Sequence, residues 1–438
     1  MKFSEQVKDF LWSIIHEMSE HPELFAKKPA SDFSRKRKLD FENLLRFLIS
    51  MESNTTRYEL LKYFDYGLCA PSNSALYQQR KKLLLEAFQY LMFQFNIGFP
   101  FEFYRGKYQL LACDGSQFNI ARNPNDVDTY HEGNGKSKKG FNMVHTISLY
   151  DVLGKRYLDC IIQPGRKRNE FQAFCDLVDR YQYGGRPIFI ADRGFSSYNC
   201  FAHAMEKGAL FLVRAKDINT KRLLNLETLP AQIDAGAEII LTRTSTKRKR
   251  KQPCLAERYR YISKDVTFDY IAHGSPDEYP MSLRILRFEI KDGIYENIIT
   301  NLPADEFPAD EIKQLYHMRW SIELSFRDLK HTIGATNLHS KKIEYIEQEV
   351  WARLILFNFC TIITSHVIVV QKNTKHLYQV NFTMAMKVCH HFIRLRRDRP
   401  PPDIEGLIGS HTLPVRPGRN YARQHRFQLP TSFWYRAS

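Results

Sequence analysis

Two short apolar runs, each ending in an aspartate, constrain the fold of this chain more than any other feature. They are Tyr108-Gln-Leu-Leu-Ala-Cys-Asp114 and Pro187-Ile-Phe-Ile-Ala-Asp192. Short continuous apolar runs predict buried strands. Around them, the periodicity predicts a hairpin over 141–163, helices near 171–181 and 198–207, and a strand at 209–213. This alternation is typical of a mixed α/β layer, with both aspartates at the C-terminal ends of strands.

The chain on either side of this layer has other periodicities. Over residues 1–104, apolar positions recur every three or four residues, which predicts a small helical domain. Residues 216–302 break the alternation of strands and helices and predict a β-rich insertion. Its strand-like runs lie at 239–244, 259–262, 266–271, 283–290 and 298–301. A long helix is expected from Pro308 past Lys330, with further helices behind it. The expected domains are a helical N-terminal domain (1–104), an α/β core in two parts (105–215 and 303–372), the β-rich insertion (216–302) and a basic C-terminal region (373–438).

The charge balance predicts a polyanionic partner. The chain has 64 Lys and Arg against 48 Asp and Glu, a net charge of +16. An excess of this size favours nucleic acid or an anionic membrane. The longest apolar stretch, 354–370, contains polar residues and is shorter than the roughly 20 residues that span a bilayer. We therefore expect a buried core helix there and no membrane partner.

The cysteines and the N-terminus indicate the compartment. Eight cysteines are scattered without a C-x-x-C pair, which argues against a structural zinc site or a disulfide framework. The first residues mix polar and apolar positions at helical spacing, unlike a secretory signal. We therefore expect a protein of the reducing cytoplasm.

Several basic segments are candidates for DNA contact. A turn at Pro71 followed by a long helix with Arg80 and Lys81 is compatible with a helix-turn-helix reader, although a solvated basic helix fits the same pattern. The run 247–251 is either a phosphate clamp or a solvated hairpin tip. The Arg-rich C-terminal region is expected to lie along DNA, with a loose surface tail as the alternative.

Basic residues that follow the two aspartates in the sequence are further candidates for phosphate contact. Lys138 and Lys139 lie in a glycine-rich loop that either touches phosphate or is an ordinary flexible loop. Arg193 follows Asp192 directly, and it is either a phosphate ligand or a structural partner for a carboxylate.

Four residues of the helix after Pro308 share one narrow stripe of its surface. They are Tyr316, Arg319, Glu323 and Lys330. At about 100° per residue all four fall within about 60°, over about 21 Å of helix. One acid among two cations and a phenol suits a metal-binding carboxylate surrounded by phosphate contacts. Trp320 and Arg327 flank the stripe, where they could stack on a base or bind the DNA backbone. For Trp320, packing in the protein core is the alternative.

Phosphodiester chemistry needs such parts. Two divalent ions about 3.5–4 Å apart activate the attacking oxygen and stabilise the leaving oxygen. Carboxylates are the hard oxygen ligands that Mg²⁺ prefers. Asp114, Asp192 and Glu323 would provide three of them.

Three motifs carry a resemblance to a known family. They are Leu111-Ala-Cys-Asp114-Gly-Ser, Ile190-Ala-Asp192-Arg-Gly-Phe195 and Tyr316/Arg319/Glu323/Lys330. In this order and spacing they resemble bacterial insertion-sequence transposases of the DDE class with the Y-R-E-K signature, the insertion sequence 4 family. The similarity runs through nearly the whole chain. It implies an α/β (α+β) fold: an RNase H-like mixed-sheet catalytic core with a β-rich insertion, a helical N-terminal DNA-binding domain and a helical, basic C-terminal region.

The resemblance also implies the activity, a DNA transposase that moves an insertion sequence by cut-and-paste. Asp114, Asp192 and Glu323 would be the catalytic residues and would hold two Mg²⁺ ions per active site, for which Mn²⁺ is an expected substitute. Water and then the freed 3′-OH would attack phosphorus, commonly through a DNA hairpin on the transposon end. The residues that would bind phosphates near the scissile bond are Tyr316, Arg319 and Lys330.

The implied partners are double-stranded DNA, as inverted-repeat ends and target, and a second copy of the chain on paired ends, at the bacterial nucleoid. Two other functions stay open: a catalytically silent DNA-binding regulator derived from a transposase, and a hydrolytic RNase H-like nuclease that never joins strands. The intact acidic triad argues against the regulator. The Tyr-Arg-Lys stripe and the basic C-terminal region exceed what simple hydrolysis needs.

Overall fold

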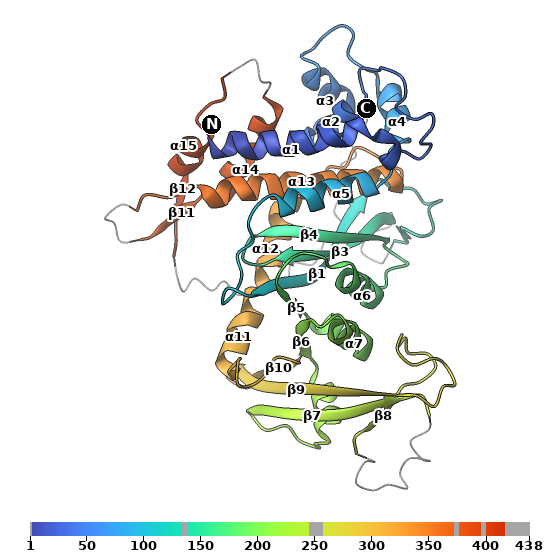
Figure 1. Cartoon of the computed structure of the whole chain (residues 1–438), viewed down its shortest axis with the longest axis vertical. Coiled ribbons are helices and arrows are strands. Elements are labelled where there is room, and N and C mark those ends of the chain that lie inside the picture. Colours follow the sequence, from blue (N-terminus) through green and yellow to red (C-terminus); the bar gives the residue numbers. More distant parts are fainter. Residues whose placement is uncertain (1, 134–138, 245–256, 372–375, 396–399, 417–438) are drawn as a thin grey trace.

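The computed structural model describes residues 2–133, 139–244, 257–371, 376–395 and 400–416. The molecule is elongated, with helices at one end, a mixed sheet in the middle and the long strands of the insertion at the other end (Figure 1). Lys138, the basic run 247–251 and the chain after Arg416 lie outside the described residues, so their expected roles stay predictions.

The N-terminal hundred residues are helical, as their periodicity predicts. They form α1 (Phe3–Glu20), the short 3-10 turn η1 (Pro22–Phe25), α2 (Phe41–Ser50), α3 (Thr56–Tyr63), α4 (Asn73–Arg80) and α5 (Glu86–Ile97). The side chains of Asp40, Thr55 and Ser72 accept hydrogen bonds from the first turns of α2, α3 and α4, which satisfies backbone N–H groups that lack helical partners. The long helix expected beyond Pro71 is wrong in length, because α4 ends at Arg80 and a turn separates it from α5.

The C-terminal helices complete the same layer. They are α13 (Ile343–His366), α14 (Phe382–Arg394) and α15 (Ile404–Ser410), with a small ribbon of β11 (Tyr378–Val380) and β12 (Thr412–Pro414). α13 is buried along almost all of its length, as its apolar sequence predicts, and α1, α2 and α5 pack against it. One hydrophobic cluster includes both Val7 of α1 and Ile408 of α15. Within the described ranges, no helix combines the length and the apolar character needed to span a membrane.

The middle of the molecule is a mixed sheet. Its strands are β1 (Tyr108–Ile120), β2 (Tyr130–His131), β3 (Phe141–Asp151), β4 (Arg156–Pro164), β5 (Arg186–Ala191) and β6 (Leu210–Ala215). β3 pairs antiparallel with β1, and β4 pairs antiparallel with β3. On the other side of β1, β5 and then β6 run parallel to it. This is the RNase H-like mixed sheet that the resemblance implies.

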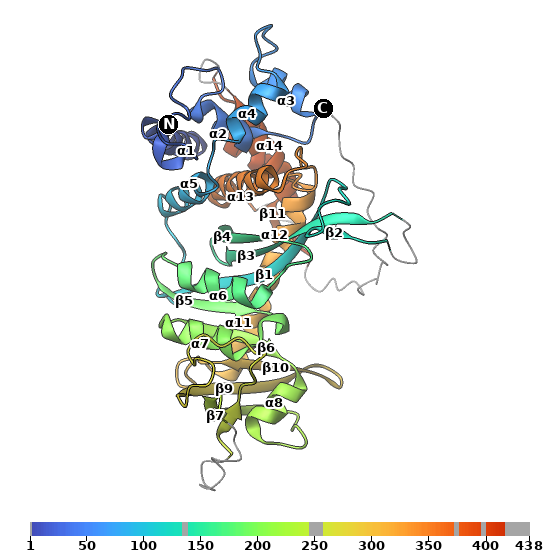
Figure 2. The ribbon, with the colours of Figure 1, turned by 90° about the vertical axis from the view of Figure 1, so that its right-hand side faces the viewer.

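Both faces of this sheet are buried. Leu110 and Ala112 of β1 belong to the cluster shared with the helical layer, whereas Leu111 and Cys113 belong to a second cluster. The second cluster includes α6 (Glu170–Arg180) and α7 (Tyr198–Glu206), which lie on the opposite face (Figure 2). Alternating side chains therefore fix the register of the strands, because a slip by one residue would exchange the two faces.

The insertion extends the core sheet. It contains α8 (Asp217–Leu224), β7 (Ile233–Thr242), β8 (Tyr259–Tyr261), β9 (Glu278–Lys291) and β10 (Ile294–Thr300). β10 pairs antiparallel with β6, so the order continues as β6-β10-β9-β7-β8. The strand predicted at 266–271 is wrong: this segment is a loop whose Phe268 and Ile271 are buried in the second cluster, which explains its apolar pattern.

The helix expected past Lys330 is two helices. They are α11 (Ala309–Met318) and α12 (Trp320–His331), and they meet at Arg319, which keeps right-handed helical angles. α12 contacts β1 and buries Ile322, Phe326 and Leu329 in the cluster of the helical layer. This packing brings the predicted stripe against the sheet.

Candidate active site

The two aspartates lie side by side on neighbouring strands. β1 and β5 are parallel, and their last paired residues are Cys113 and Ala191. Asp114 and Asp192 are the next residues of the two strands, so their carboxylates start from the same place on the sheet. Asp192 directly follows the last residue of β5, which agrees with the prediction, but β1 continues along β3 as far as Ile120. Asp114 therefore lies inside a strand, which corrects the prediction that it stands at a strand end.

Local hydrogen bonds orient both carboxylates. Asp114 Oδ1 accepts a hydrogen bond from the backbone N–H of Gly115 at 2.8 Å. Asp192 Oδ1 accepts one from Gly194 N at 2.7 Å and caps the 3-10 turn η2 (Arg193–Phe195). The glycine matters here, because a methyl group built on Gly194 would lie only 2.8 Å from Asp192 Oδ1.

Arg319 joins two of the three predicted acids. Its Nη1 donates to Asp114 Oδ2 at 3.1 Å and its Nη2 donates to Glu323 Oε1 at 3.0 Å. The Arg319 side chain is only 5% exposed, so this bridge is shielded from water. The junction between α11 and α12 thus places one guanidinium between the acid of β1 and the acid of α12.

The electrostatics of this cluster follow from burial and from crowding of like charges. Burial raises the pKa of Asp114 to about 6, Arg319 opposes the rise, and the nearby carboxylates of Asp192 and Glu323 add to it. Acids that raise one another's pKa need a positive group between them to stay ionised together. Arg319 is that group in this arrangement.

The other two residues of the stripe are less exposed than a solvated face would be. Tyr316 is 3% exposed, and its hydroxyl has no hydrogen-bond partner among the described residues. Burial raises the pKa of Tyr316 to about 12, so the phenol stays protonated. Lys330 is half-buried with Nζ 5.1 Å from the centre of the Phe118 ring, and burial lowers its pKa.

Three flanking residues are open to a ligand. Trp320 is 43% exposed, which excludes the core-packing alternative, and the Arg319 guanidinium lies 5.4 Å from its ring centre. Arg327 is exposed and its closest acid is the neighbouring Asp328, at 3.9 Å. Arg193 is exposed and makes no ion pair with a carboxylate among the described residues, which favours the phosphate alternative.

The donor chemistry of the site fits divalent cations. Asp114, Asp192 and Glu323 are hard oxygen donors on adjacent elements, of the kind that Mg²⁺ prefers. As placed, however, no group of three or more His, Cys, Asp or Glu in the described chain is arranged closely enough to hold one ion. The guanidinium of Arg319 occupies the place between two of these acids, Asp114 and Glu323.

Sequence reasoning missed a pair of residues beside the aspartates. His145 of β3 is 4% exposed, and its Nε2 lies 3.0 Å from Oε1 of Glu170, the first residue of α6. This contact with His145 holds the pKa of the Glu170 carboxyl below its usual range. No local signal marks these residues, because the pairing depends on how α6 returns to the sheet.

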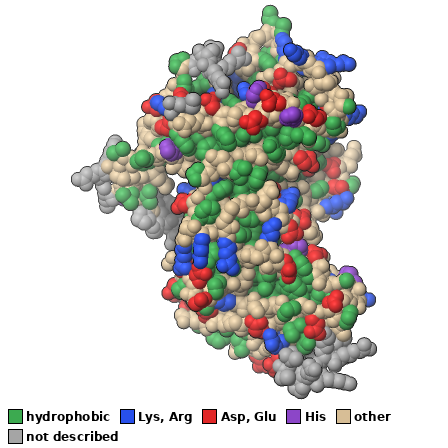
Figure 3. Space-filling view, in the orientation of Figure 1, with side chains coloured by type: hydrophobic (Ala, Val, Ile, Leu, Met, Phe, Trp, Pro, Cys, Tyr) green, Lys and Arg blue, Asp and Glu red, His purple; other side chains and the backbone are tan. Residues whose placement is uncertain are grey.

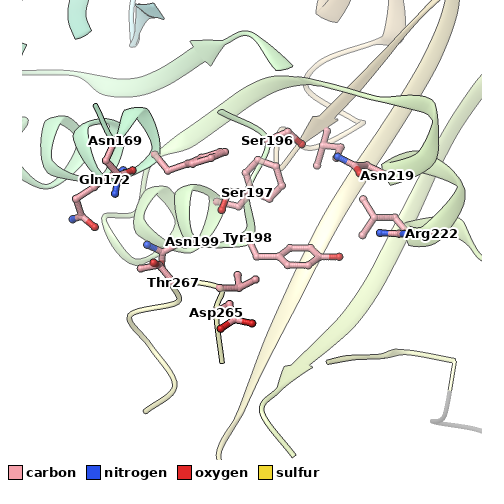
Figure 4. A pocket seen from close by; sticks show the side chains of 15 residues that line it. Asn169, Gln172, Ser196, Ser197, Tyr198, Asn199, Asn219, Arg222, Asp265 and Thr267 are labelled. Carbon is pink, nitrogen blue, oxygen red and sulfur yellow. The ribbon is translucent and has the colours of Figure 1, made fainter. Parts of the chain in front are cut away.

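A cavity of about 510 Å³ lies near the same place, between α6, α7, α8 and the loop around Asp265. Figure 4 shows Asn169 and Gln172 on one side, Asn219 and Arg222 on the other, and the Tyr198 ring between them. Its lining comes from five separated segments, the fifth being Ile299 of β10, so no motif in the sequence could have predicted it.

The expected DNA contact of Arg80 is wrong. Arg80 is fully buried, and its Nη1 pairs with Glu349 Oε1 of α13 at 2.9 Å. The helix α4 therefore turns its last residue into the protein and not toward a DNA groove. Lys81, the next residue, is exposed, and so is Lys139.

The comparisons with known proteins agree with this site. The family described as transposase DDE domain matches residues 105–359, which include all three acids and the full Tyr-Arg-Glu-Lys stripe. The match covers more than half of the chain, so the chain belongs to the transposase DDE domain family. It is accordingly an enzyme of the DNA transposase class, and the resemblance stated from its motifs is confirmed.

Its relatives include transposases of bacterial insertion sequences. The transposase InsG for insertion sequence element IS4 of Escherichia coli (strain K12) is 24% identical over 345 residues, 74% of this chain and 70% of the relative. The transposase for insertion sequence element IS231F of Bacillus thuringiensis subsp. israelensis is 26% identical over 139 residues, 31% of this chain and 28% of the relative. A piggyBac transposase synaptic complex with hairpin DNA aligns with 91% of this chain and 82% of its own, at 10% identity and a TM-score of 0.44.

Proposed function

We propose that the chain catalyses Mg²⁺-dependent cut-and-paste transposition of an insertion sequence. It cleaves DNA at the ends of the element, through a hairpin, and joins the freed ends to target DNA by phosphoryl transfer. One observation carries the proposal: Asp114 and Asp192 start side by side from the sheet, and Arg319 ties Glu323 to Asp114. Carboxylates in this arrangement are what two-metal phosphodiester chemistry requires.

The roles of the residues follow from their contacts. Bound divalent ions, Mg²⁺ or Mn²⁺, would activate the attacking oxygen and stabilise the leaving oxygen. Asp114, Asp192 and Glu323 would hold them. Arg319, no longer needed as the counter-charge of Asp114, presents a guanidinium whose N–H groups match phosphate oxygens in a bidentate manner.

Neighbouring side chains would bind the DNA around the reacting phosphate. Lys330 has no acidic partner among the described residues, so its ammonium is available to a phosphate. Tyr316 keeps its hydroxyl proton, so the hydroxyl can donate a hydrogen bond to a phosphate oxygen. The exposed ring of Trp320 offers a stacking surface for a base, and Arg327 offers a second backbone contact.

We further propose that the partners are paired inverted-repeat ends and target DNA, bound by a homodimer at the bacterial nucleoid in the cytoplasm. The net charge of +16 supports a polyanionic partner. On the face drawn in Figure 3, Lys and Arg gather in separate patches with Asp and Glu between them. DNA contact on that face is therefore spread over several places, with Lys81, Lys139 and Arg193 as exposed candidates elsewhere in the chain.

Cleavage of end-labelled DNA tests the proposal. The substrate is a fragment that contains the flanks of the gene, incubated with Mg²⁺ or with a chelator. The wild type is compared with Glu323→Gln, which keeps the shape of the side chain and removes its charge, and with Glu20→Gln on the distant helix α1 as a matched control. We expect discrete Mg²⁺-dependent cuts and hairpin-capped ends with the wild type and the control, and DNA binding without cuts with Glu323→Gln.

The other outcomes have defined meanings. Binding without any cleavage by the wild type, even with paired ends present, contradicts the enzyme and favours a DNA-binding regulator. Cleavage without joining to target DNA favours a hydrolytic nuclease.

A further inference from the structure

Glu170 is a fourth carboxylate next to the aspartate pair. It is the first residue of α6, and the start of this helix is fixed because the Asn169 side chain accepts a hydrogen bond from Gln172 N at 3.1 Å. A methyl group built on Gly194 would lie 2.8 Å from Asp192 Oδ1 and 3.7 Å from Glu170 Oε2. The two carboxylates therefore border the same small space, and these oxygens are no further apart than the sum of the two distances.

His145 borders this space from the β3 side. Its Nε2 lies at 3.0 Å from Glu170 Oε1, without the alignment of a hydrogen bond. A methyl group built on Gly115, the neighbour of Asp114, would lie 2.8 Å from both Cε1 and Nε2 of His145. The ring is 4% exposed, and its Nδ1 has no hydrogen-bond partner among the described residues. A buried imidazole whose Nδ1 lacks a hydrogen-bond partner in the described chain thus lies between Gly115 of β1 and Glu170, on the face of the sheet that α6 covers.

The two faces of the sheet explain why a fourth acid is useful here. Glu323 reaches the aspartates from α12, whose apolar residues pack with the helical layer. Glu170 approaches Asp192 from α6, whose apolar residues belong to the second cluster on the opposite face. Two ions about 3.5–4 Å apart need ligands on both sides of the central carboxylates, and this pair of helices supplies one acid to each side.

We propose that Glu170 is a fourth carboxylate of the divalent-cation site, that it binds the ion held by Asp192, and that His145 positions it. This inference rests on the proposed function, because it adds a ligand to the same cation centre. Magnesium retains open positions for water and phosphate when one or two carboxylates hold it, so an added carboxylate oxygen raises affinity without closing the site.

Mn²⁺ binding to the full-length protein, measured from the electron paramagnetic resonance signal of the free ion, tests the proposal without DNA. We expect Glu170→Gln to weaken Mn²⁺ binding on the order of tenfold or more, as loss of a ligand or its orienting partner does in other metal sites. Asp176→Asn removes the same charge from α6 at a residue whose carboxylate accepts a hydrogen bond from Gln172 Nε2 at 2.9 Å, and it should bind as the wild type does. His145→Asn should weaken binding less than Glu170→Gln, with the thermal midpoint unchanged.

Asp192→Asn separates the two proposals. If it weakens Mn²⁺ binding and Glu170→Gln binds like the wild type, the role of Glu170 is refuted and the proposed function stands. If the wild type binds no Mn²⁺, both are contradicted. Should Glu170→Gln fail to fold, Glu170→Asp, which keeps the charge on a shorter side chain, is expected to bind with intermediate affinity, and wild-type affinity would overturn the proposal.

Discussion

Replacing Arg80 with methionine should lower the free energy of unfolding by about 3–5 kcal/mol, because removal of one partner leaves the other charge of a buried pair uncompensated. The Arg80 guanidinium donates hydrogen bonds to four acceptors, and the partner Glu349 is only 2% exposed. The acceptors are Gln348 Oε1 at 3.0 Å, Ser340 Oγ at 3.0 Å, Glu349 Oε1 at 2.9 Å and Tyr345 O at 2.6 Å. His339 N and Ser340 Oγ still donate to Glu349 in the variant, so the loss should fall near the lower end of this range.

Urea unfolding followed by far-ultraviolet circular dichroism measures this loss. The matched control is Lys81→Met, which removes an equal charge from the adjacent exposed residue and should change stability by less than about 0.5 kcal/mol. The double variant Arg80→Met with Glu349→Met should be more stable than Arg80→Met alone, because the uncompensated charge is gone. If Arg80→Met unfolds like the wild type and instead lowers DNA affinity with a smaller salt dependence, Arg80 faces DNA and the reasoning is refuted.

Three further predictions concern the site and the pH dependence. Arg319→Lys keeps the charge but lacks the guanidinium fork that matches two phosphate oxygens, so we expect the cleavage rate to fall on the order of 10²-fold with DNA binding retained, measured by single-turnover cleavage; an unchanged rate would show that the guanidinium makes no phosphate contact in the reaction. Gly194→Ala pushes the Asp192 carboxylate aside and should lower cleavage on the order of 10²-fold, whereas Gly236→Ala, where a methyl group meets nothing within 4 Å, should not. Burial raises the pKa of Glu349, but a guanidinium and an imidazole lower it more, so the net pKa lies below the usual 4.5. This contribution to stability is present above about pH 4.5 and is lost as the pH falls. In a plot of unfolding free energy against pH, Glu349→Gln should therefore flatten the decline at acid pH. An unchanged decline would contradict the lowered pKa of Glu349.

Local patterns predict the elements and the acidic triad well. The apolar runs of β1 and β5, seven and six residues long, bury alternate residues in two clusters. Parallel pairing then places Asp114 beside Asp192 without further information. The spacing of Arg319 and Glu323, four residues apart, also survives the junction of α11 and α12.

Contacts between distant segments are what the sequence does not predict. The acidic partner of Arg80 is 269 residues further along the chain. Because the local sequence does not reveal this partner, Arg80 on its short helix is predicted to lie at the surface. The contact of Glu170 with His145 likewise depends on the packing of α6 on β3. The loop 266–271 has a strand pattern because its apolar side chains are buried, although its backbone has no strand partner.

Anomalous diffraction from crystals soaked in Mn²⁺ tests the central claim most directly. The claim is that Asp114, Asp192 and Glu323 form one cation centre, with Arg319 as the group that the ions displace. We predict anomalous peaks within bonding distance of carboxylate oxygens of all three residues and Arg319 turned away from Asp114. Peaks elsewhere, or none while the Arg319 bridge persists at high Mn²⁺, would contradict the account.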